Sequence, residues 1–186
     1  PWQHQSPYHT WISEIMLQQT QVLTVIPYYH RFIARFPDIQ TLAAAHEDEV
    51  CHLWAGLGYY HRAKNILKTA QIIYHEYQGQ IPDQIERLKT LPGIGPSTAA
   101  AITSQAFSQP HAIFDGNVKR VLARFFGIEG PVNEKSNLKI LEQLAHACMP
   151  TYSCQSYTQA IMDMGATCCK PKSPLCTTCP LQTRCQ

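Results

Sequence analysis

Long hydrophobic runs are missing from this sequence. No stretch of about 18 apolar residues, the length that spans a bilayer, occurs in its 186 residues, so we expect no membrane partner. The sequence also has little excess of positive over negative charge. The formal net charge is +2, which does not by itself indicate a polyanionic partner, although it can conceal a one-sided basic patch. Without repeats or low-complexity tracts, the composition indicates one large or two small folded domains.

Alternating strand-like patterns are scarce too, whereas apolar residues recur at helical spacing in nearly every segment. The sequence therefore predicts an all-α fold. Helices are predicted at about residues 60–77, 84–90, 97–107, 117–126, 134–148 and 157–164. Near the start of the chain, one helix face is predicted to carry Ile12, Ile15, Met16, Val22, Leu23 and Ile26.

Cysteine, by contrast, is abundant and clustered. Four of the eight cysteines, Cys169, Cys176, Cys179 and Cys185, have the spacing C-x6-C-x2-C-x5-C. Four thiolates can bind one Zn²⁺ or hold the irons of a cubane cluster. A four-sulfur zinc site usually has two C-x2-C pairs, and this segment has one, so the spacing favours iron–sulfur over zinc. Disulfides are a further alternative, disfavoured because the cysteines cluster and no signal-peptide pattern is recognisable.

The segment LPGIGPSTA at residues 91–99 lies between two predicted helices and indicates a hairpin. Gly93 and Gly95 permit tight backbone geometry and the close approach of a ligand. Pro96 and Ser97 open the second helix, whose free N–H groups suit a phosphate. A turn between helices can contain two glycines for structural reasons alone, but the full string is more specific. It matches the helix-hairpin-helix element that grips a DNA backbone without reading sequence.

Together, the hairpin and the cysteine segment make the chain resemble the helix-hairpin-helix DNA glycosylases that carry a 4Fe–4S cluster, the endonuclease III superfamily. Three strings narrow the resemblance to MutY-type adenine DNA glycosylases: SEIMLQQTQ at 13–21, GLGYY at 56–60 and DGNVKRV at 115–121. The resemblance covers essentially the whole chain. It implies a six-helix barrel at residues 7–109 and a helical cluster domain at residues 110–186 joined by residues 1–6. We expect the chain to be a fragment without the C-terminal 8-oxoguanine-recognition domain usual in this family.

The resemblance also implies the activity, the cofactor and the partners. The expected reaction is hydrolysis of the N-glycosidic bond of adenine opposite 8-oxoguanine or guanine, in base excision repair. A 4Fe–4S cluster would be held by Cys169, Cys176, Cys179 and Cys185. The expected partner is double-stranded DNA with an adenine mispair, bound by a monomeric, cytoplasmic enzyme that is nucleoid-associated if the source is bacterial.

Ser97 discriminates between two reaction types within this superfamily. Bifunctional glycosylase/lyases of the endonuclease III kind place a lysine at this position to form a Schiff base with the sugar. A serine hydroxyl cannot form that adduct, so the sequence predicts a monofunctional enzyme that leaves an abasic site.

Two carboxyl groups are candidates for the chemistry, because cleavage requires a proton on the departing purine and negative charge beside an oxocarbenium-like sugar. Glu14 lies opposite the apolar stripe of its predicted helix, where a glutamate is ordinarily just solvated. Asp115 precedes a predicted helix, where its ordinary role is N-terminal capping. The resemblance implies that Glu14 protonates adenine N7 and that Asp115 stabilises the sugar cation, by charge or by a transient covalent adduct. Asn117 matches the family position that orients these groups.

The resemblance assigns DNA contacts to Gln18, Gln19, Tyr59 and Lys119, besides the hairpin residues Gly93, Gly95 and Ser97. Extrusion of adenine leaves a gap in the stack, which Gln19 and Tyr59 would probe and fill. The sequence alone does not decide whether Gln19 and Tyr59 contact DNA or pack within the protein. A continuous helix would project Gln19 into the apolar stripe, and the GLGYY turn can pack a tyrosine ring against the core.

Two other functions remain as alternatives at this point. The first is an endonuclease III-like glycosylase/AP lyase, which Ser97 disfavours. The second is a non-catalytic iron–sulfur DNA-binding module that uses the hairpin and the metal loop for docking, which Glu14 and Asp115 disfavour.

Overall fold

The computed structural model describes residues 6–186 and contains only helices, turns and loops within that range. The predicted all-α fold is confirmed. The chain divides into two compact units, the first ending at Phe107 and the second spanning Ser108–Gln186. Residues 1–6 were predicted to join the second domain, and residues 1–5 of that segment lie outside the described residues. None of the described helices combines the length and the apolar character needed to cross a bilayer.

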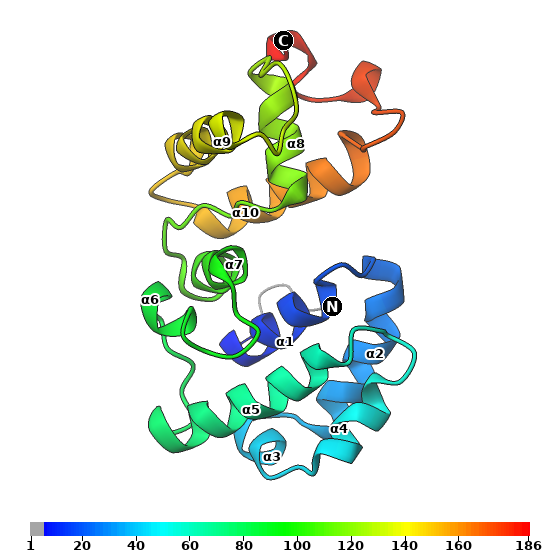
Figure 1. The fold of residues 1–186 in the computed structure, drawn as a ribbon, viewed down its shortest axis with the longest axis vertical. Helices are drawn as coiled ribbons and strands as arrows, with labels where there is room; N and C mark the ends of the chain where they lie inside the picture. The colour runs from blue at the N-terminus through cyan, green and yellow to red at the C-terminus, as the bar shows by residue number, and fades with distance from the viewer. Residues whose placement is uncertain (1–5) are drawn as a thin grey trace. The chain divides into compact units, whose positions relative to one another are not determined.

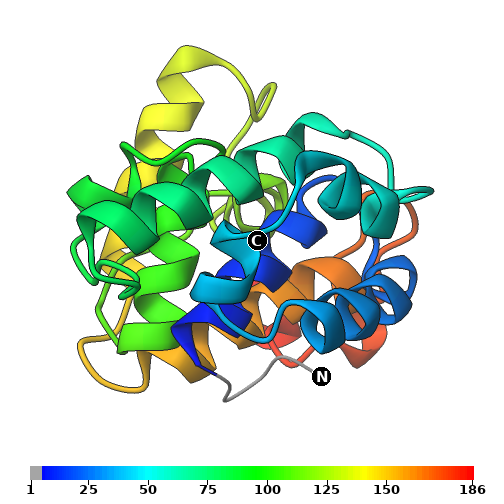
Figure 2. The ribbon, with the colours of Figure 1, turned by 90° about the horizontal axis from the view of Figure 1, so that it is seen from below.

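Helix α1 crosses the middle of the first unit and packs against α2, α5 and α7 (Figures 1 and 2). Its buried side chains include Trp11, Ile12, Ile15 and Met16, each at most 1% exposed, as the predicted stripe requires. The unit's helices are α1 (Pro7–Leu17), α2 (Val22–Arg35), α3 (Ile39–Ala43), α4 (Glu47–Trp54), α5 (His61–Glu76), α6 (Ile85–Leu88) and α7 (Pro96–Phe107).

The boundaries of α1 follow from local chemistry. The Ser6 hydroxyl accepts a hydrogen bond from the His9 backbone N–H, and Pro7 occupies the first turn, where its missing N–H costs nothing. The helix ends at Leu17 because the backbone turns at Gln19, whose φ of 56° is left-handed.

This turn corrects one prediction. Val22 and Leu23 were expected on the buried face of a continuous helix, but they lie in the next helix, α2, and are 48% and 82% exposed. The stripe that begins in α1 is interrupted because the left-handed residue reorients the chain between the two helices.

The second unit is built on α8, which packs against α9, α10 and the short helix η1. Val118, Val121 and Leu122 of α8 and Leu141 and Ala145 of α9 are all buried and form its apolar centre. Beyond η1 the chain continues as a cysteine-containing segment with single 3₁₀ turns. The elements are α8 (Gly116–Phe125), α9 (Lys135–Cys148), α10 (Cys154–Asp163), η1 (Met164–Cys168), η2 (Cys176–Thr178) and η3 (Gln182–Arg184).

Candidate active site

Glu14 lies on α1, half-buried, and faces α7 rather than open solvent. Its Oε1 accepts a hydrogen bond of 3.1 Å from the Gln105 amide of α7. The sequence reasoning placed Glu14 off the apolar stripe but did not identify this partner, which is 91 residues away in the chain. A carboxyl group fixed by a neighbouring helix is preorganised in a way that a solvated surface glutamate is not.

Asp115 has the capping role that its sequence position suggests. It is the N-cap of α8, and its Oδ1 accepts a hydrogen bond of 2.8 Å from the Val118 backbone N–H. The side chain is half-buried. A carboxylate has two oxygens and several lone pairs, so a single capping bond leaves it able to act on another group as well.

Asn117 is held two residues further along, by a guanidinium and a close backbone approach. Arg120 Nη2 donates to its Oδ1 at 2.7 Å and also to the Gly165 carbonyl at 2.6 Å. A Cβ atom on Gly165 would lie 2.6 Å from Asn117 Cβ, so only glycine allows α8 and η1 to approach this closely. Arg120 Nε further donates to the Cys169 carbonyl at 2.7 Å. The start of α8 and the cysteine segment are therefore braced as one piece.

The two turns that carry Gln19 and Tyr59 share an unusual backbone. Both residues have a left-handed conformation, with φ of 56° and 50°, although neither is glycine. Gln19 is exposed and Tyr59 is 53% exposed, so neither side chain packs into the core as the alternative reading required. Exposed Val22 and Tyr60 flank them.

The predicted hairpin consists of α6, the turn that follows it and α7. Gly93 has a φ of 79°, and a Cβ atom there would lie 3.0 Å from Asn65 Cβ. Thr69 Oγ1 donates to the Pro92 carbonyl at 2.9 Å. These contacts from α5 fix the turn from its inner side. Gly95 differs, because its φ is not positive and no described atom lies within 4 Å of where its Cβ would be.

Gln18 braces this hairpin from α1. Its Nε2 donates to the Gly93 carbonyl at 3.2 Å and to Thr98 Oγ1 at 3.1 Å. Both amide hydrogens are thereby used within the first unit, and the predicted DNA contact of Gln18 is one that its remaining carbonyl oxygen would make. Ser97 is half-buried in the first turn of α7, where its side chain adjoins the free N–H groups of the helix.

The cysteine segment is folded by short local turns held by backbone hydrogen bonds. The π-helical turn η1 ends at Cys168, and the Cys169 backbone N–H donates to the Met164 carbonyl at 2.7 Å. Such π-turns concentrate at functional sites. The Cys179 N–H donates to the Cys176 carbonyl at 3.2 Å, closing the C-x2-C turn. All eight cysteines are free thiols, so the disulfide alternative receives no support.

The thiols of this segment interact electrostatically. Burial raises the pKa of the Cys185 thiol, and negative charge at Cys169, Cys179 and Cys176 raises it further, while Arg124 opposes the shift. Four thiolates near one another repel unless a cation lies among them, so this donor set suits a metal centre. Within residues 6–186, however, no three His, Cys, Asp or Glu side chains are gathered closely enough to hold a metal ion.

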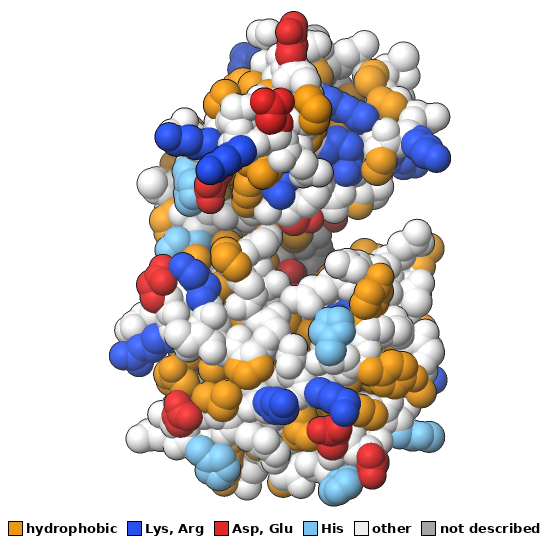
Figure 3. Space-filling model, in the orientation of Figure 1, with side chains coloured by type: hydrophobic (Ala, Val, Ile, Leu, Met, Phe, Trp, Pro, Cys, Tyr) orange, Lys and Arg blue, Asp and Glu red, His pale blue; other side chains and the backbone are white. Residues whose placement is uncertain are grey.

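Arginines of α8 bind this segment. Arg124 Nη1 donates to Cys169 Sγ at 3.5 Å and to the Lys170 carbonyl at 2.7 Å. Figure 3 shows Lys and Arg side chains gathered over α8 and the cysteine segment, on the surface of the second unit. Lys119, which was predicted to contact DNA, lies in the same helix, and its Nζ is 4.8 Å from the centroid of the Phe114 ring. The mild net charge of the chain therefore conceals a basic surface on this unit.

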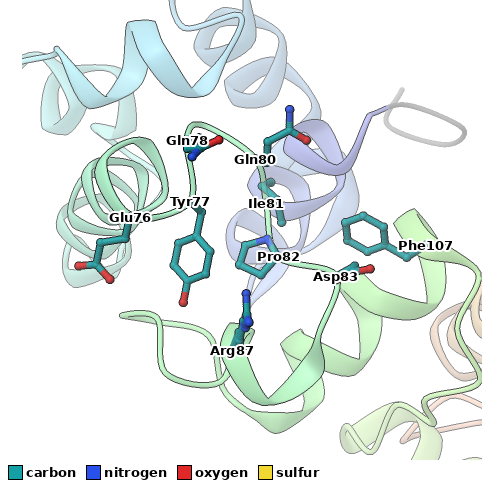
Figure 4. Close-up of a pocket in the computed structure, with 9 residues that line it drawn as sticks. All are labelled: Glu76, Tyr77, Gln78, Gln80, Ile81, Pro82, Asp83, Arg87 and Phe107. Carbon is teal, nitrogen blue, oxygen red and sulfur yellow. The ribbon is translucent and has the colours of Figure 1, made fainter.

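A pocket of about 440 Å³ lies elsewhere in the first unit, beside the segment that joins α5 to α6 (Figure 4). Its lining includes Glu76, Tyr77, Asp83, Arg87 and Phe107, and none of the predicted site residues. Its position therefore does not coincide with the chemistry that the sequence predicts.

The sequence reasoning missed Gln105, Arg120 and a third residue, Arg62. Arg62 is only 2% exposed and donates hydrogen bonds to both left-handed turns. One signal was available. Arg62 shares the helical spacing of Ile66, Thr69 and Ile73, which are buried on α5, and a charge on a buried stripe requires partners.

Comparison with known proteins identifies the family of this chain. The model of the HhH-GPD superfamily base excision DNA repair proteins matches residues 12–147. The chain therefore belongs to this superfamily of base excision DNA repair proteins. A thermostable thymine-DNA glycosylase of known structure is 30% identical, with a TM-score of 0.89 over 100% of this chain and 86% of that one. Endonuclease III in a non-covalent DNA complex shares the fold, with a TM-score of 0.85 at 24% identity over 100% and 85% of the two chains.

Within the superfamily, the chain is similar in sequence to adenine DNA glycosylases. The one from Buchnera aphidicola subsp. Baizongia pistaciae is 48% identical over 100% of this chain and 53% of that protein. The Homo sapiens adenine DNA glycosylase is 42% identical over 96% of this chain and 33% of that protein. The chain thus spans about half the length, or less, of these relatives.

Proposed function

We propose that this chain is the catalytic part of an adenine DNA glycosylase, which hydrolyses the N-glycosidic bond of adenine mispaired with 8-oxoguanine or guanine. The similarity to adenine DNA glycosylases over essentially the whole chain carries this proposal. The residues fit the reaction. Glu14 and Asp115 supply the two carboxyl groups, and Ser97 stands where a lyase would need an amine.

In the proposed mechanism, double-stranded DNA binds to the hairpin through its phosphates, and the target adenine leaves the stack. Glu14 transfers a proton to adenine N7 as the C1′–N9 bond breaks, so the base departs neutral. Asp115 stabilises the positive charge on the sugar, and Asn117 orients these groups. Water then adds its hydroxyl to C1′ and loses a proton, which leaves an abasic site.

The proposal includes a 4Fe–4S cluster held by Cys169, Cys176, Cys179 and Cys185. The close spacing of these four cysteines along the sequence and the adjacent Arg120 and Arg124 support it, because a cluster with four thiolates is anionic. The cluster would act as a structural centre that fixes the basic surface for DNA rather than as a participant in bond cleavage. Iron analysis of anaerobically purified protein tests this part of the proposal, since zinc in place of iron would contradict it.

Adenine release is the experiment that tests the proposed function. Duplexes carrying one adenine opposite 8-oxoguanine, guanine or thymine are incubated with anaerobically purified protein, and abasic sites are revealed with alkali. Release opposite 8-oxoguanine and guanine, but not thymine, is the expected result. A duplex with thymine opposite guanine is included because a similar structure is that of a thymine-DNA glycosylase. Release of thymine instead of adenine would contradict the proposed substrate.

Gly95→Ala is expected to weaken DNA binding about tenfold without lowering stability. A methyl group at this position meets no described atom of the protein and requires no left-handed backbone, so the fold tolerates it. The methyl would instead stand where the phosphate backbone is proposed to approach. Fluorescence anisotropy with a mispaired duplex measures the affinity, and thermal unfolding measures the stability.

Gly79→Ala is the matched control, because Gly79 lies outside the hairpin, has a φ of 76° and also has open space around it. The added methyl should cost about 1 kcal/mol of stability through backbone strain and leave DNA affinity unchanged. If Gly95→Ala binds DNA as tightly as the parent protein, the hairpin does not grip the backbone at this glycine.

A further inference from the structure

Arg62 occupies the first turn of α5 and is 2% exposed. Its two terminal nitrogens donate to five backbone carbonyls and one hydroxyl, whereas its buried Nε has no hydrogen-bond partner among the described residues. Nη1 donates to the carbonyls of Ile15 at 3.0 Å, Met16 at 2.7 Å and Gln18 at 2.7 Å. Nη2 donates to Thr20 Oγ1 at 3.1 Å, the Gly58 carbonyl at 3.1 Å and the Leu57 carbonyl at 3.4 Å.

The acceptors belong to two separate turns. One turn ends α1 and contains Gln19, and the other joins α4 to α5 and contains Tyr59. Arg62 holds the first turn on both sides of Gln19, at the Gln18 carbonyl and the Thr20 hydroxyl. It holds the second at the Gly58 carbonyl, the residue before Tyr59. The two left-handed residues are thereby attached to one rigid group.

The chemistry of the site requires arginine. The last carbonyls of α1 have no partner within the helix, and a cation at a helix C-terminus complements the helix dipole. Burial lowers the pKa of the Arg62 guanidinium, yet an arginine remains charged at neutral pH. The ring centroids of Trp54 and Tyr59 lie 5.3 Å and 5.4 Å from Arg62 Cζ, within cation–π range. A lysine keeps the charge but cannot reach two turns with one planar fork.

The backbone of both turns depends on such support. A left-handed conformation at a residue other than glycine costs about 1–3 kcal/mol and persists where the surroundings over-determine it. Gln19 is exposed, and Tyr59 is 53% exposed with ring contacts to Arg62 and His61, so packing into the apolar core does not fix either residue. Their conformation therefore depends on the groups that bind the flanking backbone.

We propose that Arg62 is a positioning residue that locks Gln19 and Tyr59 into a single rigid element for probing the DNA duplex. The inference rests on the proposed function and on the role that the family resemblance predicts for these two side chains, which is to enter the duplex when adenine leaves the stack. Arg62 itself does not touch DNA in this scheme. Its contribution is to fix the spacing and direction of the two probes before DNA arrives, which removes an ordering cost from the binding step.

A double-mutant cycle tests this proposal. Arg62→Lys is measured in the parent protein and in a Gln19→Ala/Tyr59→Ala background, by single-turnover adenine excision from an 8-oxoguanine mispair. In the parent protein the excision rate is expected to fall about tenfold or more, because small misplacements of positioning groups carry large rate effects. In the double-alanine background the same change should cost less than about twofold, because the positioned groups are gone. Equal losses in both backgrounds would show that Arg62 acts only on general stability and would overturn the proposal.

Two further variants keep the test decisive if Arg62→Lys fails to fold. Thr20→Val removes one acceptor of the guanidinium, together with the hydroxyl's own hydrogen bond to the Gln18 carbonyl in the same turn, and retains the side-chain shape. It should lower the excision rate by about twofold to fivefold in the parent background only. A loss that persists in the double-alanine background would overturn the proposal. Arg35→Lys is the matched control. Arg35 lies at the end of α2 in an exposed ion pair with Glu49, so this substitution should leave excision unchanged.

The outcomes also separate this proposal from the proposed function, which fails if the parent protein releases no adenine from the mispair. If the double-alanine variant excises adenine at the parental rate, the probing role of Gln19 and Tyr59 fails, and the inference fails with it. If that variant is slow but Arg62→Lys slows it equally again, only the inference about Arg62 fails.

Discussion

Glu14→Gln is expected to lower the rate of adenine excision by about 10²- to 10⁴-fold, the contribution typical of a positioned general acid. The change removes the transferable proton and almost nothing else. A glutamine oxygen can still accept the 3.1 Å hydrogen bond from Gln105, and the side chain keeps its size. Duplex affinity should therefore stay within about twofold of the parent value.

Single-turnover excision and anisotropy, measured on the same 8-oxoguanine mispair, separate the two effects. Glu47→Gln is the matched control, because it makes the same chemical change at an exposed partner of Lys64. It should leave both quantities unchanged apart from a small loss of stability. Retained excision in Glu14→Gln would remove Glu14 from the mechanism, whereas a parallel loss of affinity would assign it to binding.

Asp115→Asn is expected to reduce excision by about 10²- to 10³-fold while changing stability by less than about 1 kcal/mol. Asparagine and aspartate are comparable N-caps, so the hydrogen bond to the Val118 N–H survives the substitution. Only the negative charge is lost. The substitution therefore distinguishes the two roles of Asp115, since capping does not need the charge and stabilisation of the sugar cation does.

Asp38→Asn provides the control, because Asp38 caps α3 in the same way, through the Thr41 backbone N–H at 2.8 Å. Thr41 hydrogen bonds hold the pKa of the Asp38 carboxyl below its usual range, so this variant should lose slight stability but no activity. Asp115→Ala should lose both activity and the cap, at about 1 kcal/mol of stability. Full activity in Asp115→Asn would leave Asp115 a capping residue alone.

Much of this architecture could be predicted from the sequence, because helices and short motifs are local. Apolar spacing predicted α5, α7 and α9, and the glycine string predicted the hairpin. The prediction of one continuous apolar stripe failed where the sequence has no glycine or proline to mark a turn. Gln18, Gln19 and Thr20 include no glycine or proline, so the left-handed turn that exposes Val22 and Leu23 had no visible signal.

Contacts between distant segments account for the remainder. The packing of the helices decides which amide contacts Glu14 and which turns Arg62 joins. Neither contact follows from spacing along one helix. Asp115 illustrates a different limit. Its capping bond and its proposed catalytic role use the same carboxylate, so a sequence position that indicates one role does not exclude the other.

The most direct measurement is adenine release from duplexes that carry one adenine opposite 8-oxoguanine, guanine or thymine, with thymine opposite guanine as a fourth substrate. Alkali-revealed abasic sites opposite 8-oxoguanine and guanine, absent opposite thymine and absent with Glu14→Gln, are the result expected for an adenine DNA glycosylase. Intact duplex binding with no released adenine, or release of thymine from the fourth substrate, would contradict it.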